Sequence, residues 1–300
     1  VVIAFLLNGL MNALLKMDIS QQLSLTITLL VFFGCYMSLF LALPSIGTEI
    51  NNLLQNLPII VSSFQQTLVE MNNYFSKEDI DLIFANLSNQ INSLLSSALG
   101  QLAGTISLMF NAILYAIMIP LMVFFFLKDK NELLPIASFL LPKENGFMQS
   151  VFSEMNDQLF NYVTGKFLEM IIVASASYIL FAALGLPYAV LIAILVGLSV
   201  IIPIFGAILV TIPVVLIGLY EWGVSENFYW LLGFYLLIQI LDGNVLVPIL
   251  FSTRNNLHPA VIIVAILFFG GIWGFWGLFF AIPLATFIKA IINSWPEPID

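Results

Sequence analysis

Long apolar stretches limit what this chain can fold into more than any short motif does. Residues 167–300 contain five of them: 167–186, 187–202, 204–220, 228–250 and 259–291. A helix that crosses a lipid bilayer needs about 20 predominantly apolar residues. Only 8% of the 300 residues are charged and 61% are hydrophobic, whereas about 25% of the residues in a typical soluble domain are charged. The sequence therefore predicts an all-α integral membrane protein that crosses the bilayer several times.

The composition argues against several classes of protein. A net charge of −9 with eight basic residues disfavours a nucleic-acid partner, because neutralising phosphates requires clustered Lys and Arg side chains. The single histidine, His258, cannot supply a two-histidine metal motif. The sequence also lacks the Gly-x-Ser-x-Gly elbow of hydrolases and a glycine-rich phosphate loop. We therefore expect no enzyme activity, no cofactor and no resident metal ion.

The first part of the chain alternates between membrane stretches and polar segments. Residues 1–44 contain two apolar stretches, which are separated by Lys16 and Asp18 and end at Pro44. Because the sequence begins inside an apolar stretch and without a methionine, we expect a further membrane span upstream. Residues 105–127 predict another span, and 167–300 predict the C-terminal membrane core that carries out transport.

Residues 45–104 have a different pattern from their neighbours. Apolar residues recur there at spacings of three and four, with Asn, Gln and Ser between them, which is typical of amphipathic helices. A polar stretch near 74–81 separates two such helices, so we expect an amphipathic helical hairpin outside the hydrocarbon. Its apolar stripes must be buried against each other, against another subunit or at the surface of the bilayer.

Basic residues predict the orientation in the membrane. Segment 128–166 carries Lys128, Lys130, Lys143 and Lys166, whereas 45–104 carries only Lys77. Cytoplasmic loops hold an excess of Lys and Arg, so we expect 128–166 to be cytoplasmic and 45–104 to be external. Lys166 lies near the start of an apolar stretch, and we interpret it as a side chain that reaches to the membrane surface.

The last apolar stretch is too long for a simple span. As one helix, 259–291 would measure about 50 Å, against about 30 Å of hydrocarbon. Four glycines lie at its centre: Gly270, Gly271, Gly274 and Gly277. We expect either a re-entrant hairpin with a glycine-rich tip or a long tilted span. Pro203 and Gly206 suggest a second interruption and Pro213 a hinge, and interrupted helices of this kind indicate the binding site of a transporter. Further breaks are expected at Pro187, Pro248, Pro259 and Pro283.

Asp242 is the most informative single residue. It lies deep in the stretch 228–250, with Gln239 on the same helix face and Asn244 two residues later. An ionisable residue inside a membrane costs about 2.5–3.5 kcal/mol on insertion scales and suggests a functional site. We expect these three residues to contact a polar solute or a monovalent cation; the alternative is that Asp242 caps a broken helix. Glu169 is interpreted as a structural acid in the first turn of a helix.

A polar joint, 252–258, lies between the last two apolar stretches. Within it, Arg254 could bind an anionic or hydroxylated solute, or it could be a basic anchor at the interface. His258, just before Pro259, could line the same path, or it could mark the start of a helix.

The sequence resembles the autoinducer-2 exporter family of bacterial membrane transporters. The likeness is collinear over nearly all 300 residues and rests on these motifs: Ile3–Asn8, Phe124–Asp129, Tyr162–Lys166, Gly185–Ala189, Pro203–Gly206 with Pro213, Gln239–Pro248, Leu257–Pro259, and Gly270–Gly277 with Pro283. The sequence departs from the family pattern at Lys166, often glutamine, and at Asp242, where glutamate is expected. The resemblance implies a multi-pass protein of the bacterial inner membrane, with an external insertion, that forms homo-oligomers through the membrane core or through 45–104.

Three functions follow from this resemblance and from the residues. The first is alternating-access transport of a small polar solute, such as an autoinducer-2-like signal or another metabolite. The second is Na⁺(Li⁺)/H⁺ antiport in which Asp242 exchanges the ions. The third, from a different class, is a non-transporting oligomeric scaffold assembled through 45–104.

Overall fold

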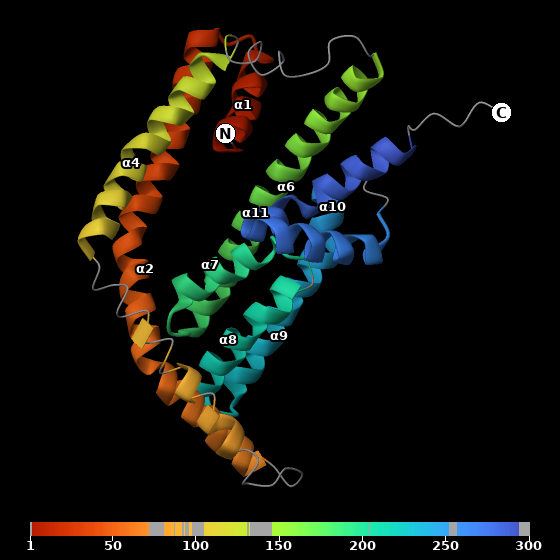
Figure 1. Cartoon of the computed structure of the whole chain (residues 1–300). Coiled ribbons are helices and arrows are strands. Elements are labelled where there is room, and N and C mark those ends of the chain that lie inside the picture. Colours follow the sequence, from red (N-terminus) through yellow and green to blue (C-terminus); the bar gives the residue numbers. More distant parts are fainter. Residues whose placement is uncertain are drawn as a thin grey trace, which may run out of the picture. The chain divides into compact units, whose positions relative to one another are not determined.

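The computed structural model contains only helices in the part of the chain that it describes (Figure 1). The described residues are 2–71, 81–86, 88–91, 93, 96–97, 105–130, 132, 146–203, 205–251 and 257–293. Five helices in these ranges are long and apolar enough to cross a membrane: Gln21–Val69, Gln158–Leu184, Phe205–Trp222, Glu226–Phe251 and Ala260–Lys289. The predicted all-α, multi-pass membrane fold is therefore confirmed.

Helical elements with defined bounds follow one another along the chain. In chain order they are α1 (Val2–Leu15), α2 (Gln21–Met71), α4 (Thr105–Lys128), α6 (Gly146–Leu184), α7 (Ala189–Ser199), α8 (Phe205–Trp222), α9 (Glu226–Leu241), the π-helical turn η1 (Asp242–Leu246), α10 (Val247–Phe251) and α11 (Pro259–Asn293). The chain forms two compact units. Unit 1 consists of Val1–Leu39, Tyr115–Leu168 and Val247–Asp300, and unit 2 consists of Phe40–Leu114 and Glu169–Leu246.

Unit 2 has an apolar core that draws on several helices. Side chains of α6, α7, α8 and α9 form it, among them Phe181, Ile192, Val214 and Leu231. Gly197 of α7 allows close packing on α6, since a Cβ at this position would lie 2.7 Å from Cβ of Ala174. Dense packing of this kind fixes the relative positions of these four helices.

In unit 1, the start of α2 packs against the end of α4. Phe32 of α2 and Val123 and Leu127 of α4 are buried together. After α4, Lys130 Nζ donates hydrogen bonds to Oδ1 of Asn8 (2.9 Å) and of Asn12 (3.4 Å) in α1. The end of α4 therefore lies beside the second half of α1.

Several predicted helix boundaries are wrong. The helix expected to stop at Pro44 continues through Pro44 and Pro58 to Met71, and α6 runs through the boundary expected at residues 166–167. α8 and α11 likewise continue through Pro213 and Pro283. A proline inside a membrane helix is tolerated where neighbouring groups satisfy the carbonyl that loses its amide donor, so proline alone does not mark a helix end.

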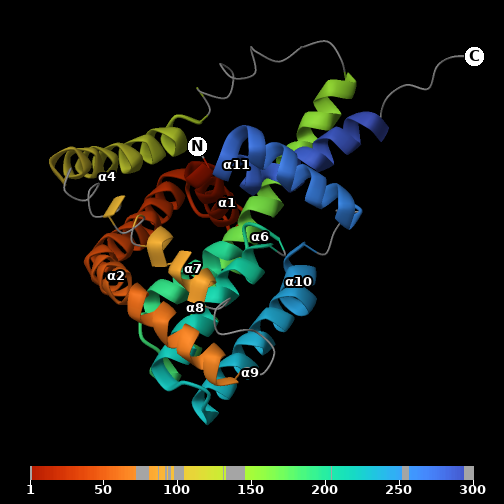
Figure 2. The same ribbon diagram turned by 60° about the horizontal axis from the view of Figure 1, so that its bottom comes forward.

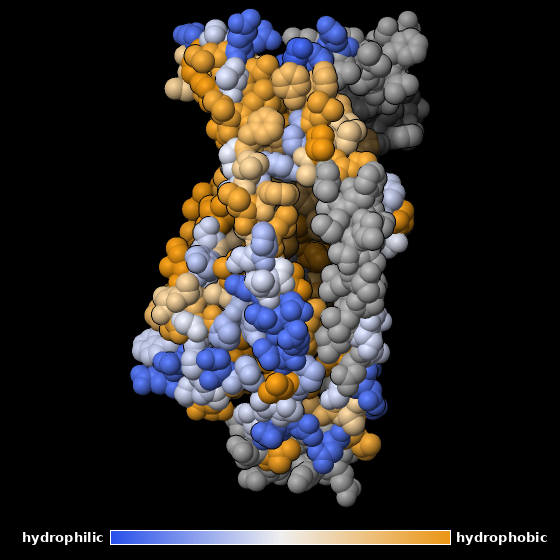
Figure 3. Space-filling model, turned by 90° about the vertical axis from the view of Figure 1, so that its left-hand side faces the viewer, coloured by the Kyte–Doolittle hydropathy of each residue, from blue (hydrophilic) through white to orange (hydrophobic). Residues whose placement is uncertain are grey.

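The polar second half of α2 buries part of its apolar stripe within the chain. Leu53 and Ile60 pack against the core of unit 2, and Val61 packs with Phe84, from the second helix of the expected hairpin. The turn expected near 74–81 lies, except for Asp81, outside the described residues. On the face that Figure 3 shows, apolar and polar side chains gather in separate patches. The external location of 45–104 stays a prediction.

Candidate functional site

The predicted site around Asp242 lies where α9 stops being a regular helix. Asp242 follows the last residue of α9 and begins η1. A π-helical turn inside an α-helix is frequent at functional sites. The Asp242 side chain is half-buried, and its Oδ1 atom has less than 1 Å² of exposed surface. The structure thus gives the segment 228–250, expected as one apolar span, a local change of helix type at its acidic residue.

The three polar residues of this segment differ in their surroundings. Gln239 is half-buried, and its Nε2 atom is buried without a hydrogen-bond partner among the described residues. Asn244 is exposed, and its Nδ2 atom donates to the carbonyl oxygen of Ile240 at 2.9 Å. Asn244 therefore stabilises its own helix, whereas the Gln239 amide lies beside the Tyr235 hydroxyl and, with two protons, has a donor left for a ligand.

Two residues that the sequence analysis did not single out extend the polar face of α9. Tyr235 is fully buried, and its hydroxyl oxygen lies 3.0 Å from Oγ1 of Thr211 in α8. Thr211 donates its own proton to the carbonyl oxygen of Ala207 at 2.7 Å, so the Tyr235 hydroxyl is the donor to Thr211. The Tyr235 ring stacks on Phe181 of α6, 6.3 Å away between centroids.

Tyr235, Gln239 and Asp242 are spaced by four and three residues, which places them on one face of a helix. With Thr211 they form what we call the polar face of unit 2. The apolar core encloses this face at Tyr235. Polar groups in such surroundings are costly unless they are hydrogen-bonded. The spacing Tyr-x-x-x-Gln-x-x-Asp was visible in the sequence, but only the contact with Thr211 shows where this face points.

The interruption predicted at Pro203 and Gly206 is confirmed. α7 has 11 residues, about 17 Å, and is too short to cross about 30 Å of hydrocarbon. The chain then turns into α8, where the Gly206 amide donates to the carbonyl oxygen of Ile202 at 2.8 Å. Gly206 packs directly on the carbonyl group of Ser199, where any Cβ would clash. Pro203 and Gly206 thus shape a tight helical hairpin in unit 2.

The long stretch 259–291 is a hairpin and not a straight tilted span (Figures 1 and 2). Gly274 has φ 58° and ψ −132°, a conformation that only glycine adopts readily. Gly277 packs on the carbonyl group of Phe269, which brings the two halves of α11 together beside the turn. At the tip, Trp273, Phe275 and Trp276 are exposed.

Two charged residues of α6 are buried, which corrects our interpretation of both. Lys166 is 5% exposed, and its Nζ lies 5.3 Å from the ring centroid of Phe251 in unit 1; it does not reach a surface. Gly165 makes room for this ring, since its Cβ would lie 2.7 Å from Cε1 of Phe251. Glu169, 2% exposed, lies in the middle of α6 in unit 2 and not in a first turn. The sequence feature that could have indicated this burial is a pair of opposite charges three residues apart next to an apolar run.

The joint before α11 is described only in part. His258 Nδ1 accepts a hydrogen bond from the amide of Ala260 at 3.2 Å, so this exposed side chain caps the start of α11. This geometry favours the helix-start interpretation of His258. Arg254 lies outside the described residues, and its role stays a prediction.

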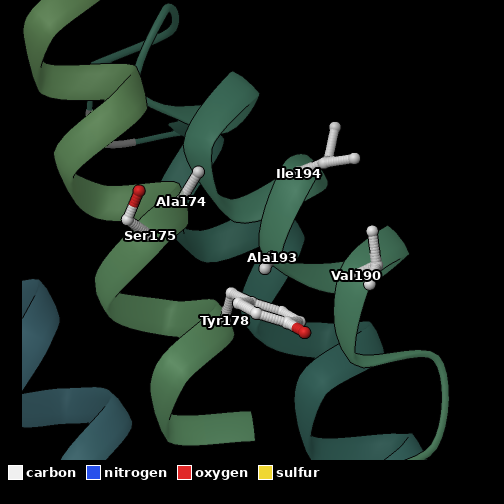
Figure 4. A pocket seen from close by; sticks show the side chains of 6 residues that line it. All are labelled: Ala174, Ser175, Tyr178, Val190, Ala193 and Ile194. Atoms are coloured by element: carbon white, nitrogen blue, oxygen red, sulfur yellow. The ribbon is translucent and has the colours of Figure 1, made fainter. Parts of the chain in front are cut away.

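A small open pocket of about 250 Å³ lies between α6 and α7 in unit 2 (Figure 4). Ala174, Ser175 and Tyr178 line it from α6, and Val190, Ala193 and Ile194 line it from α7. Its lining is mainly apolar and includes none of the predicted site residues. Within the described ranges, no group of three His, Cys, Asp or Glu residues could hold a metal ion.

Comparison with known proteins identifies similar sequences over almost the whole chain. The model of the AI-2E family transporters matches residues 1–297. Permease PerM of Escherichia coli (strain K12) is 42% identical over 305 aligned residues, which cover 99% of this chain and 86% of the relative. AI-2 transport protein TqsA of the same strain is 24% identical over 292 aligned residues, which cover 97% of this chain and 83% of the relative.

Proposed function

The chain belongs to the AI-2E transporter family, and from this premise we propose that it moves a small polar solute across the membrane by alternating access. The protein is a multi-pass membrane protein of a transporter family. The solute, the mechanism and the absence of enzyme activity are our proposals. The relative named for AI-2 transport suggests an autoinducer-2-like signal as one solute to test, and other small metabolites fit the same chemistry.

The polar face of unit 2 is the observation that carries this proposal. Gln239 Nε2 is a buried donor without a partner among the described residues, and Asp242 stands at the change from α-helix to π-helical turn. An amide donor and a carboxylate acceptor on one helix face suit a solute with hydroxyl and carbonyl oxygens. Binding at an interrupted helix segment is the usual arrangement in transporters with broken helices.

Counterflow in proteoliposomes tests the proposal. A panel of small hydroxylated metabolites, including autoinducer-2, is assayed with the unchanged protein and with Gln239→Leu and Tyr235→Phe. We expect both variants to lower the exchange rate by about fivefold or more, since each removes one hydrogen bond, worth about 0.5–1.5 kcal/mol, or leaves a buried partner unpaired.

Tyr229→Phe is the matched control, because Tyr229 lies on α9 but is 61% exposed. Its exchange rate should stay within twofold of the unchanged protein. Equal rates for Tyr235→Phe, Gln239→Leu and the control would show that the polar face does not bind the solute.

Antiport of Na⁺ or Li⁺ against H⁺ is the second candidate. The buried Oδ1 atom of Asp242 favours it, because an exchanging carboxylate must be shielded from bulk water to select between a proton and a metal cation. Asp242→Asn should abolish proton movement driven by a sodium gradient in vesicles. Normal exchange by this variant would eliminate antiport through Asp242.

We also propose that the protein lies in the bacterial inner membrane, with 128–166 cytoplasmic and 45–104 external, and that it forms homo-oligomers through the membrane core or 45–104. The scaffold hypothesis has less support, because unit 2 and Phe84 cover part of the apolar stripe of α2 within one chain. The scaffold hypothesis predicts that Asp242→Asn changes neither cell growth nor solute movement in vesicles.

A further inference from the structure

Prolines inside membrane helices create a specific chemical problem. A helical residue normally donates its amide proton to the carbonyl oxygen four residues earlier, and proline has no such proton. The carbonyl oxygen left over cannot turn to water inside a bilayer, so another donor must satisfy it. Pro283 in α11 leaves the carbonyl of Phe279 in this state, and Pro120 in α4 leaves that of Ala116.

A tyrosine hydroxyl from another helix reaches the open carbonyl in α11. Tyr162 of α6 donates to the carbonyl oxygen of Phe279 at 3.0 Å, and Tyr162 is only 5% exposed. Its ring contacts Phe279 edge-on, 6.2 Å between centroids, and also lies near Phe251 at 5.9 Å. The hydroxyl is therefore held in place by aromatic packing on two sides.

The same arrangement occurs independently in α4. Tyr36 of α2 donates to the carbonyl oxygen of Ala116 at 3.1 Å, which is the carbonyl four residues before Pro120. Tyr36 packs against the buried cluster of Phe32, Val123 and Leu127. Two tyrosine hydroxyls in unit 1 thus reach the two carbonyls that these prolines leave without an amide donor.

We infer that Tyr162 is the positioning residue of the α11 hairpin. Its hydroxyl supplies the hydrogen bond that Pro283 cannot, and it fixes the second half of the hairpin to α6 at the point where the helix lacks its own bond. Because the donor is a single side chain, this attachment can be broken and remade while α11 stays helical. That the attachment matters for transport rests on the proposed function; that it positions the hairpin does not.

A double-mutant cycle tests the inference. Tyr162→Phe keeps the ring contacts and removes the donor, so hydrogen–deuterium exchange of residues 275–290 should speed up by about five- to tenfold. Pro283→Ala supplies an amide proton to Phe279, so Tyr162→Phe made in that background should change exchange by less than twofold. Tyr36→Phe is the matched control and should speed up exchange in α4 but not in α11.

Each outcome decides the matter. A Tyr162→Phe protein that fails to accumulate, beside a double variant that does, supports the inference. The inference is overturned if Tyr162→Phe leaves exchange unchanged, or if Pro283→Ala does not rescue it. Counterflow is measured on the same proteins. If Pro283→Ala rescues deuterium exchange as expected but none of the proteins, including the unchanged one, transports a solute, the proposed function is wrong and the role of Tyr162 stands.

Discussion

At the scale of single residues, burial and hydrogen bonding separate the polar side chains that stabilise this protein from those available to a solute. The side chains of Asn244 and His258 are engaged with the backbone of their own helices. Tyr235 and Thr211 are joined to each other, and Gln239 keeps a buried donor without a described partner. Polar character alone therefore does not identify a binding residue in a membrane protein; the available donor or acceptor does.

Gly274 offers a prediction at this scale. Gly274→Ala would place a side chain on a backbone with φ 58° and ψ −132°, which costs about 1–3 kcal/mol. The expected result is a lower midpoint of thermal unfolding in detergent and faster deuterium exchange at the tip of the hairpin. Gly271→Ala is the control, because Gly271 has ordinary helical geometry and no atom within 4 Å of its Cβ position. Equal effects of the two substitutions would contradict a glycine-dependent turn.

At the scale of helices, short elements depend on contacts from elsewhere in the chain. α7 begins after Tyr188, whose side chain makes no cap. Glu49 of α2 takes this role, since its Oε2 atom accepts a hydrogen bond from the amide of Leu191 at 2.8 Å. A carboxylate also interacts favourably with the partial positive charge at a helix N-terminus. Two turns of α2 further, Asn56 Nδ2 donates to the Tyr188 hydroxyl at 2.8 Å.

The prediction for this element is that Glu49→Ala destabilises α7. Loss of a capping acceptor costs about 0.5–2 kcal/mol, so amides in the first turn of α7 should exchange faster by about threefold or more. The control is Asn52→Ala, a change at an exposed position on the same helix. If exchange in α7 is the same in both variants, Glu49 does not cap this helix.

At the scale of the whole molecule, the chain passes between the two units four times, at residues 39–40, 114–115, 168–169 and 246–247. Among the described residues, each unit contains a helical hairpin with a glycine packed directly on a carbonyl group, Gly206 in unit 2 and Gly277 in unit 1. Irregular backbone of this kind survives in a membrane only where protein or a water-filled cavity satisfies its polar groups. The hairpins thus indicate where each unit departs from simple membrane-spanning helices.

Labelling of single cysteines tests the predicted orientation. In a Cys35→Ser background, Ser93→Cys and Glu132→Cys introduce thiols at exposed positions. A membrane-impermeant maleimide added to intact cells, with the outer membrane permeabilised, should label residue 93 and should label residue 132 only after lysis. The reverse pattern would place 45–104 in the cytoplasm and invert the proposed topology.

The sequence by itself determined that lipid is the solvent for much of this protein, and it located two of the interruptions in its helices. Hydropathy, the missing amide proton of proline and the backbone freedom of glycine are local properties, so they predicted the membrane fold and the interruptions at Pro203–Gly206 and 270–277. Tertiary packing decided the rest. α6 is apolar around most of its circumference within the span, and such a helix gives no periodic signal for its buried face. For that reason several features depend on neighbours distant in the sequence. They are the burial of Lys166 and Glu169, the contact of Tyr235 with Thr211, and the tyrosine donors that let helices continue through Pro120 and Pro283.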